Sequence, residues 1–133
     1  MKRIIGIATF LILLGSSFMS LSADNPPSSD ELKAIGTVSN YLDALMAGDT
    51  SGALQYLAPG VAEQRRAMFN NPNYPAQLQQ AYANAQYVVT SSTVLSVSEI
   101  QVEVKITLRQ QDTVHSRFVL TLHNNQFLIS SEK

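Results

Sequence analysis

The clearest hydrophobic pattern in the chain is a strict alternation over residues 100–108, IQVEVKITL. Because successive side chains of a strand point to opposite faces, this segment predicts a strand with one apolar and one polar face. The apolar face carries Ile100, Val102, Val104, Ile106 and Leu108, and the polar face carries Gln101, Glu103, Lys105 and Thr107. Burial of the five apolar side chains would contribute at most about 8–15 kcal/mol. A slip of one residue would expose all five, so the strand's orientation is fixed.

Two further segments near the C-terminus also alternate. Residues 87–97 are rich in Val, Thr and Ser, and their imperfect alternation predicts a strand that contains a bulge. Residues 114–123 predict the next strand. Its inward face is expected to carry Ser116, Phe118, Leu120 and Leu122. The connections between these strands are short, so we expect them to be antiparallel neighbours.

The last hairpin is predicted by its turn. Asn124-Asn125 is a two-residue loop of residues that tolerate a positive φ, which favours a type I′ turn. The turn would place apolar residues of the two strands opposite one another, in the pairs Leu122–Phe127 and Leu120–Ile129. Both hairpin strands would therefore present apolar side chains to the same side of the sheet.

The first half of the chain has the period of a helix. Ser28 and Glu31 have the spacing of a capping box, and Gly48 is a typical C-terminal cap. Between them an apolar stripe predicts a helix of roughly 18 residues. The stripe consists of Leu32, Ile35, Val38, Tyr41, Leu42, Leu45 and Met46.

Shorter helices are expected over residues 50–57, 61–69 and 77–85, with an irregular proline-containing segment at 70–75. Helices followed by four consecutive antiparallel strands indicate an α+β domain, in which N-terminal helices pack on one face of a four-stranded meander sheet.

Residues 1–23 have the layout of a secretory signal peptide. A short basic start precedes an apolar run over residues 4–14, and small residues lead up to Ala23, after which we expect cleavage. Residues 24–29, DNPPSS, would form a short linker, and residues 30–133 a single domain. The sequence therefore predicts an exported protein, periplasmic or secreted. An uncleaved leader that anchors the domain in a membrane is the alternative.

Net charge limits the kinds of partner that the domain can bind, and cysteine content limits how its fold can be stabilised. Loss of Lys2 and Arg3 with the leader would take the formal net charge from −1 to −3. A mildly acidic domain without a basic stripe is a poor candidate for nucleic acid or, after cleavage, for a membrane surface. The chain has no cysteine, so an exported domain of this sequence must be stabilised by its core alone.

The order of elements resembles that of the nuclear transport factor 2-like (NTF2-like) superfamily. The likeness rests on Tyr41-Leu42-x-Ala44-Leu45 running into Gly48-Asp49, on Ala53-Leu54 and Leu57, and on Asn124-Asn125-Gln126-Phe127-Leu128-Ile129. The resemblance implies a curved sheet that wraps the first helix into a cone, with Phe127 and Ile129 directed inward. In this superfamily the open end of the cone holds a small ligand, an active site or a protein partner.

Enzymes of this superfamily carry an acid, a histidine or a tyrosine on the inner surface of the cone. In the predicted register Ser116 is the only polar residue that projects inward from the strands over residues 100–108, 114–123 and 126–129, so no general base is expected there. We therefore expect no catalysis, no cofactor and no metal site. His115 and His123 would share an outer face about 26 Å apart, too far to share a metal ion.

Two candidate surfaces remain. All five tyrosines belong to the helical half or its junction with the sheet, where they are either ordinary core aromatics or the lining of a pocket. The candidate pocket consists of Tyr41, Tyr56, Tyr82, Phe118 and Ser116. The outer sheet face, with Lys105, Arg109, His115 and Arg117, is either plain solvated sheet or the surface of a homodimer or other partner.

The sequence therefore favours a non-catalytic exported binding domain, which holds a small apolar ligand or a protein partner in or around the cone. An isomerase- or dehydratase-like enzyme of the same fold, and a membrane-anchored accessory subunit of an envelope assembly, are the alternatives.

Overall fold

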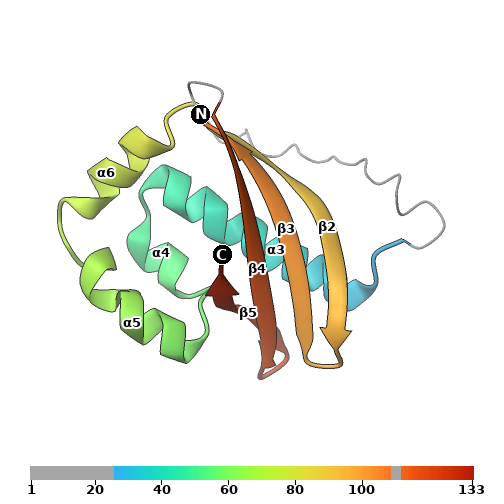
Figure 1. Cartoon of the computed structure of the whole chain (residues 1–133). Helices are drawn as coiled ribbons and strands as arrows, with labels where there is room; N and C mark the ends of the chain where they lie inside the picture. The colour runs from blue at the N-terminus through green and yellow to red at the C-terminus, as the bar shows by residue number, and fades with distance from the viewer. Residues whose placement is uncertain (1–25, 109–111) are drawn as a thin grey trace.

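A computed structural model describes residues 26–108 and 112–133 of the chain. It contains a layer of helices on one face of a four-stranded antiparallel sheet with the strand order β2-β3-β4-β5 (Figure 1). The elements in chain order are α3 (Ser29–Ala47), α4 (Thr50–Leu54), α5 (Pro59–Phe69), α6 (Tyr74–Ala81), β2 (Gln86–Ser96), β3 (Glu99–Thr107), β4 (Thr113–His123) and β5 (Gln126–Glu132). The predicted α+β meander is confirmed. The predicted leader, residues 1–23, lies outside the described residues.

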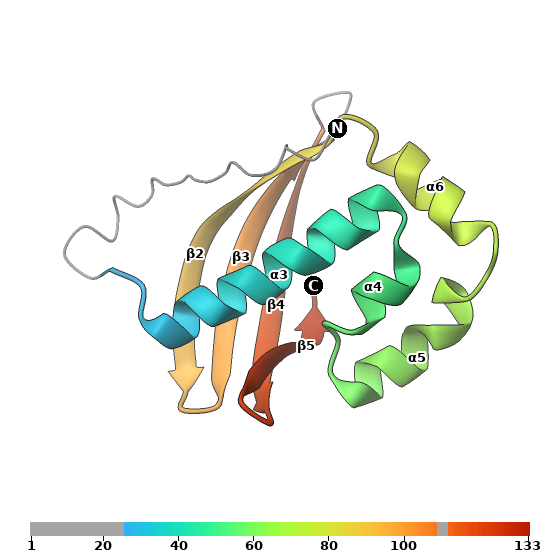
Figure 2. The ribbon, with the colours of Figure 1, turned by 180° about the vertical axis from the view of Figure 1, so that it is seen from behind.

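The sheet curves around α3, which crosses its inner face, while α4, α5 and α6 extend the helical layer beyond β5 (Figure 2). In β3 the apolar side chains point to the inner face of the sheet, as predicted. Four of them are buried: Ile100, Val102, Val104 and Ile106. Leu108 follows the end of β3 and packs partly buried against the same core. Among the described residues, no helix is both long and apolar enough to span a lipid bilayer.

Helix α3 begins and ends at the predicted caps. The Glu31 N–H donates to the Ser28 hydroxyl at 3.1 Å, and the Ser28 N–H donates to the Glu31 carboxylate at 2.9 Å. Gly48 ends the helix with a φ of 75°, a value that a residue with a Cβ rarely adopts. The buried face consists of Ala34, Val38, Tyr41, Leu42 and Leu45. Leu32, expected in the stripe, is instead 56% exposed, because Ala34 occupies the buried face in that turn.

The shorter helices differ from the prediction at their ends. Helix α4 stops at Leu54, and α5 begins at Pro59 because a proline is favourable in the first turn, where its missing N–H has no partner to lose. For the same reason α6 begins at Tyr74, before Pro75, inside the segment expected to be irregular, and it ends at Ala81.

The hairpin prediction is confirmed. Asn124 and Asn125 have φ values of 50° and 68°, and the predicted pairs Leu122–Phe127 and Leu120–Ile129 are present. The bulge expected in β2 is also present, as register shifts at Thr90 and Leu95. Leu122 stands opposite the buried Phe127, as predicted, but it is 40% exposed one residue before the end of β4.

Glu31 ties the beginning of α3 to the edge of the sheet. Besides its capping bond, its carboxylate accepts a hydrogen bond of 2.7 Å from the Ser92 hydroxyl in β2. Partial burial opposes ionisation of Glu31, but the hydrogen bonds from the Ser28 backbone and from the Ser92 and Ser28 hydroxyls outweigh it and lower its pKa. Glu31 therefore stabilises the fold when it is ionised.

Replacement of this carboxylate tests the contact. We expect Glu31→Gln to lower the free energy of unfolding by about 1–2 kcal/mol at neutral pH, because it weakens the cap and the bond to Ser92. The matched control Asp30→Asn removes an equal charge from the same helical turn without a contact to β2, and should cost less. Urea unfolding measures both.

The pH dependence gives a second readout. The folded pKa of Glu31 lies below its usual value of 4.5, so its contribution is present above that value and is lost as pH falls through the folded pKa. Glu31→Gln should therefore flatten the acid limb of the stability curve relative to Asp30→Asn. Identical dependence of the unfolding free energy on pH in the two variants would contradict the contact between Glu31 and Ser92.

Candidate functional site

A bulge in the last strand turns an acidic residue into the cone. β5 pairs Ile129 with Leu120 and then Ser131 with Val119, so Ser130 has no opposite residue in β4. The Ser130 hydroxyl donates to the Val119 carbonyl at 2.9 Å. An unpaired extra residue reverses the alternation that follows it. Glu132 consequently stands opposite the buried Phe118, on the inner side of the sheet.

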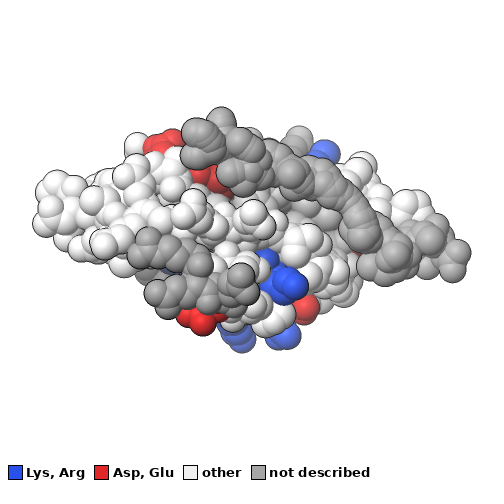
Figure 3. Space-filling model, turned by 90° about the horizontal axis from the view of Figure 1, so that it is seen from above, with Lys and Arg blue, Asp and Glu red and all other residues white. Residues whose placement is uncertain are grey.

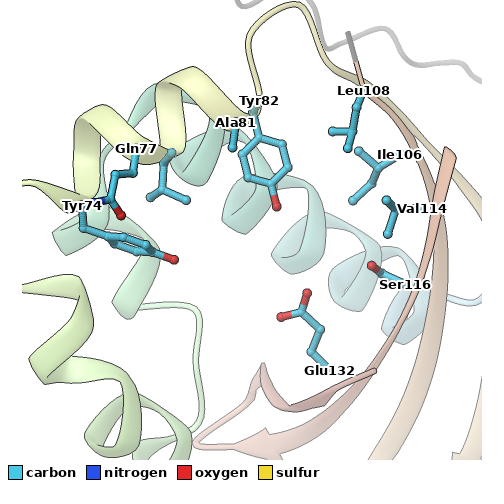
Figure 4. Close-up of a pocket in the computed structure, with 10 residues that line it drawn as sticks. Tyr74, Gln77, Ala81, Tyr82, Ile106, Leu108, Val114, Ser116 and Glu132 are labelled. Atoms are coloured by element: carbon cyan, nitrogen blue, oxygen red, sulfur yellow. The ribbon is translucent and has the colours of Figure 1, made fainter. Parts of the chain in front are cut away.

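Glu132 faces a pocket of about 480 Å³ between α6 and the inner face of the sheet. One part of its wall is apolar, and the other carries hydroxyl, amide and carboxylate groups. The lining residues are Tyr74, Gln77, Leu78, Ala81, Tyr82, Ile106, Leu108, Val114, Ser116 and Glu132. Figure 4 shows the Tyr74, Tyr82 and Ser116 hydroxyls and the Glu132 carboxylate all directed toward the middle of the cavity. The pocket therefore combines an apolar wall with a convergent set of polar groups.

Arg65 of α5 supports the carboxylate from outside the pocket lining. Its Nη1 lies 3.3 Å from the Glu132 Oε1 and donates a second hydrogen bond of 3.0 Å to the Tyr41 hydroxyl. Tyr41 is 1% exposed and packs edge-on against Phe118, with ring centroids 6.2 Å apart. The network thus links α3, α5 and β5 through residues of which only Glu132 lines the pocket.

Burial and the nearby Glu132 carboxylate raise the pKa of Tyr82 and Tyr41. Burial raises the pKa of Tyr82 above its usual value, and the negative charges of Glu132 and ionised Tyr74 would raise it further. Burial and the Glu132 charge also raise the pKa of Tyr41, against the opposing effect of Arg65. At neutral pH both hydroxyls therefore carry a proton and can donate a hydrogen bond.

Seen from the end of the molecule at which α6 joins β2, few charged side chains are visible, and both signs occur (Figure 3). No wide area of one sign lies on this face of the described chain.

No protein-family model and no curated protein matches the chain. Solved structures do match it. A candidate NTF2-like transpeptidase from Campylobacter jejuni has 13% sequence identity and a TM-score of 0.57, over 73% of this chain and 96% of its own. An NTF2-like protein of unknown function from Shewanella oneidensis has 14% identity and a TM-score of 0.58, over 75% and 93%.

A further NTF2-like protein of unknown function, from Shewanella baltica, covers 89% of this chain and 94% of its own, with a TM-score of 0.54 and 7% identity. The chain has an NTF2-like fold. At identities this low the likeness concerns the fold alone, since unrelated functions occur on one fold.

The NTF2-like cone brings together part of the predicted pocket. Tyr82 and Ser116 line it. Tyr41 and Phe118 are fully buried behind it. Tyr56 packs partly buried against the core and does not line the pocket.

The expectation that the sheet presents no acid to the interior is wrong, because the bulge at Ser130 directs Glu132 inward. Sequence reasoning missed Glu132 and Tyr74. The one signal for Glu132 was that no apolar residue follows Ile129, so nothing in the pattern fixed the direction of the last side chains.

The candidate partner residues lie on the opposite side of the sheet. Lys105 stands opposite His115 across β3 and β4, and Arg117 pairs with Glu103 at 3.4 Å. All three candidate side chains are exposed. Arg109, the fourth, lies outside the described residues.

The position of Glu132 can be tested through the tyrosines. Because its charge helps to raise the pKa of Tyr82 and Tyr41, we expect Glu132→Gln to lower both values toward that of a free tyrosine. Ultraviolet absorbance of the tyrosinate against pH measures the shift, with circular dichroism to confirm that the protein stays folded.

Glu63→Gln is the matched control. Glu63 lies on α5, is mostly exposed and pairs with Arg66 at 3.3 Å, so its loss should leave the tyrosine titration unchanged. Superimposable curves for the wild type and Glu132→Gln would contradict an inward Glu132.

Proposed function

We propose that this protein is a non-catalytic binding domain whose cone holds a small, mainly apolar ligand with a hydrogen-bond donor at one end. The observation that carries the proposal is the carboxylate of Glu132 in a cavity that is otherwise walled mostly by apolar and aromatic side chains. Arg65 pairs with Oε1 of this carboxylate from outside the pocket lining, so the carboxylate keeps lone pairs that can accept a hydrogen bond from a donor group of a ligand.

The size and lining of the pocket support a small molecule. Ligand sites commonly measure about 300–1,000 Å³ and combine an apolar lining with a few convergent polar groups, and the volume of about 480 Å³ falls in this range. Leu78, Ile106, Leu108 and Val114 would contact the apolar body of the ligand. Glu132 would accept a hydrogen bond from its polar end, and the hydroxyls would contact any acceptor beside it.

The polarity of the ligand follows from the Arg65–Glu132 pair. Arg65 approaches one oxygen of the Glu132 carboxylate but does not line the pocket. The cavity is therefore lined by the negatively charged member of this ion pair and not by the positively charged one. An alcohol or an amine can donate a hydrogen bond to the Glu132 carboxylate. A ligand that is itself a carboxylate cannot donate one, and Glu132 would repel it.

A series of probes of one shape tests the proposal. We expect naphthylmethanol and naphthylmethylamine to bind at least about ten-fold more tightly than naphthoate, a difference of about 1.4 kcal/mol. Isothermal titration calorimetry measures the affinities. In Glu132→Gln, the ratio between the affinities for naphthylmethanol and for naphthoate should be smaller than in the wild type.

The control concerns the apolar wall. Ala81→Phe should fill the pocket and abolish binding of all probes, whereas Ala76→Phe, an exposed position on the same helix that does not line the pocket, should leave it unchanged. Equal affinity for the three probes, or equal effects of the two phenylalanine variants, would contradict a binding site here.

A second candidate is a proton-transfer enzyme of the isomerase or dehydratase kind. It is favoured by the common direction of the Glu132 carboxylate and the Tyr82 hydroxyl in one cavity (Figure 4). A carboxylate can act as a general base, and a protonated tyrosine can donate to the oxygen of an enolate. The lining contains no histidine within the described residues.

Hydrogen exchange at carbon separates the two candidates. If the pocket is catalytic, the protein should accelerate the exchange of the α-protons of a cyclic ketone in D₂O, and Glu132→Gln should remove the acceleration. The binding proposal predicts no exchange above the rate without protein. Nuclear magnetic resonance of the ketone measures it.

We also propose that the domain acts after export, in the periplasm or outside the cell, on the basis of the leader-like residues 1–23. A protein partner at the cone, a homodimer through the sheet face, or an accessory role in an envelope assembly with the leader kept as an anchor would be alternatives to a free ligand-binding protein. The intact mass of the protein from its host distinguishes a cleaved from an uncleaved leader.

A further inference from the structure

The two edges of the sheet differ in how their backbone groups are used. At the β5 edge, the Ile129 N–H donates to the Tyr56 carbonyl at 2.9 Å, and the Ile129 carbonyl accepts from the Ala58 N–H at 2.7 Å. This short parallel bridge covers the outer edge of β5 at Ile129. β2 pairs only with β3 in the described sheet, so about half of its backbone N–H and C=O groups point away from any strand.

The sequence of β2 lacks two features that protect many edge strands, charged side chains and prolines, although its bulges at Thr90 and Leu95 are a third such feature. Residues 86–98, QYVVTSSTVLSVS, contain no charged residue, no proline and no glycine. Charged side chains and prolines, like bulges, are among the means by which proteins prevent edge strands from pairing. Apolar side chains here are instead exposed, with Val94 at 53%, Leu95 at 48% and Val97 at 93%.

We propose that β2 is a pairing edge and that its partner is β2 of a second copy of this chain, antiparallel across a two-fold axis. An antiparallel pair of identical strands is self-complementary, so one contact closes the assembly. A head-to-tail contact between β2 and β5 would need the β5 edge, which residues 56–58 cover at Ile129. No residue over 86–98 is charged, so β2 itself adds no repulsion between two copies, and the nearby Glu31 carboxylate is hydrogen-bonded to Ser92.

The bulges locate the contact within β2. Register shifts at Thr90 and Leu95 leave a regular run over residues 91–94. The exposed Val94, Leu95 and Val97 lie at or just beyond the end of this run, so pairing centred on it would shield apolar surface as well as backbone groups. The paired edges would join two four-stranded sheets into one of eight strands.

The dimer is independent of the proposed ligand. No residue of β2 lines the pocket, and β2 and α6 lie on opposite sides of the molecule along most of the strand (Figure 1). Both pockets would remain open in the pair, so failure of ligand binding and failure of dimerisation are separate results.

Sedimentation velocity tests the proposal on protein expressed as the full chain, over about 1 µM to 1 mM, a range that reports affinities down to about −4 kcal/mol. We expect a reversible monomer–dimer equilibrium for the wild type. The double variant Thr93→Lys with Leu95→Lys places like charges on both sides of the seam and should raise the dimer dissociation constant at least ten-fold. A wild type that stays monomeric throughout overturns the proposal.

The control is His115→Glu on the outer face of β4, opposite Lys105. It changes the charge of the outer sheet face and leaves the edge untouched, so dimerisation should be unchanged. Loss of the dimer in His115→Glu, with the dimer kept in the edge variant, would assign the contact to the outer face and overturn the proposal.

Hydrogen–deuterium exchange of the wild type gives a readout that needs no variant. Amides of β2 should exchange more slowly as protein concentration rises, while those of β4 keep their rate. Exchange in β2 that is independent of concentration, in a protein that sediments as a dimer, would also overturn it.

Discussion

The structure depends on the burial of alternate residues of β3 and β4 against α3. Val102, Phe118 and Leu120 are fully buried, and so is Val38 on the helix that covers them. Each such side chain contributes roughly 1.5–3 kcal/mol, and a register slip would lose all of them together. The two central strands therefore have one allowed orientation, and every other part of the domain must adapt to it.

The fixed orientation explains why, in the described part of the sheet, a carboxylate enters the pocket only where the alternation is broken. β5 continues the inward pattern through Phe127 and Ile129, and the unpaired Ser130 then reverses it. Glu132 is thereby turned inward without any change in the strands that form the core. A carboxylate in such a place requires a partner, and Arg65 of α5 provides one while it also donates to Tyr41. The site is thus built by the end of the sheet and the helices together.

Much of the fold follows from local sequence. The alternation in β3, the capping box at Ser28, the Gly48 cap and the Asn124-Asn125 turn each rest on residues close together in the chain, and each was predictable. The helix boundaries near Pro59 and Pro75 were misplaced because a proline that interrupts a helix and a proline that begins one look alike in sequence. The exposure of Leu122 depends on where the helical cover ends, which is a tertiary property.

The site was predictable only in part, because the direction of one of its side chains depends on how two strands pair. Tyr82 and Ser116 belong to segments whose direction the pattern fixes, whereas the direction of Glu132 depends on a single unpaired residue. The bond from Ser130 to the Val119 carbonyl crosses from β5 to β4, so it forms only once the register of the hairpin has been set. The NTF2-like fold itself supplies a cone and leaves the chemistry to such local departures.

The inward direction of Glu132 can be observed without a ligand or a variant. In a nuclear Overhauser spectrum of the labelled protein, the side-chain protons of Glu132 should show cross-peaks to the Tyr82 ring, to residues of the pocket wall, or to both. Cross-peaks instead to Arg117 and Val119 on the outer face, with none to the pocket residues, would contradict the bulge and the pocket chemistry that depends on it.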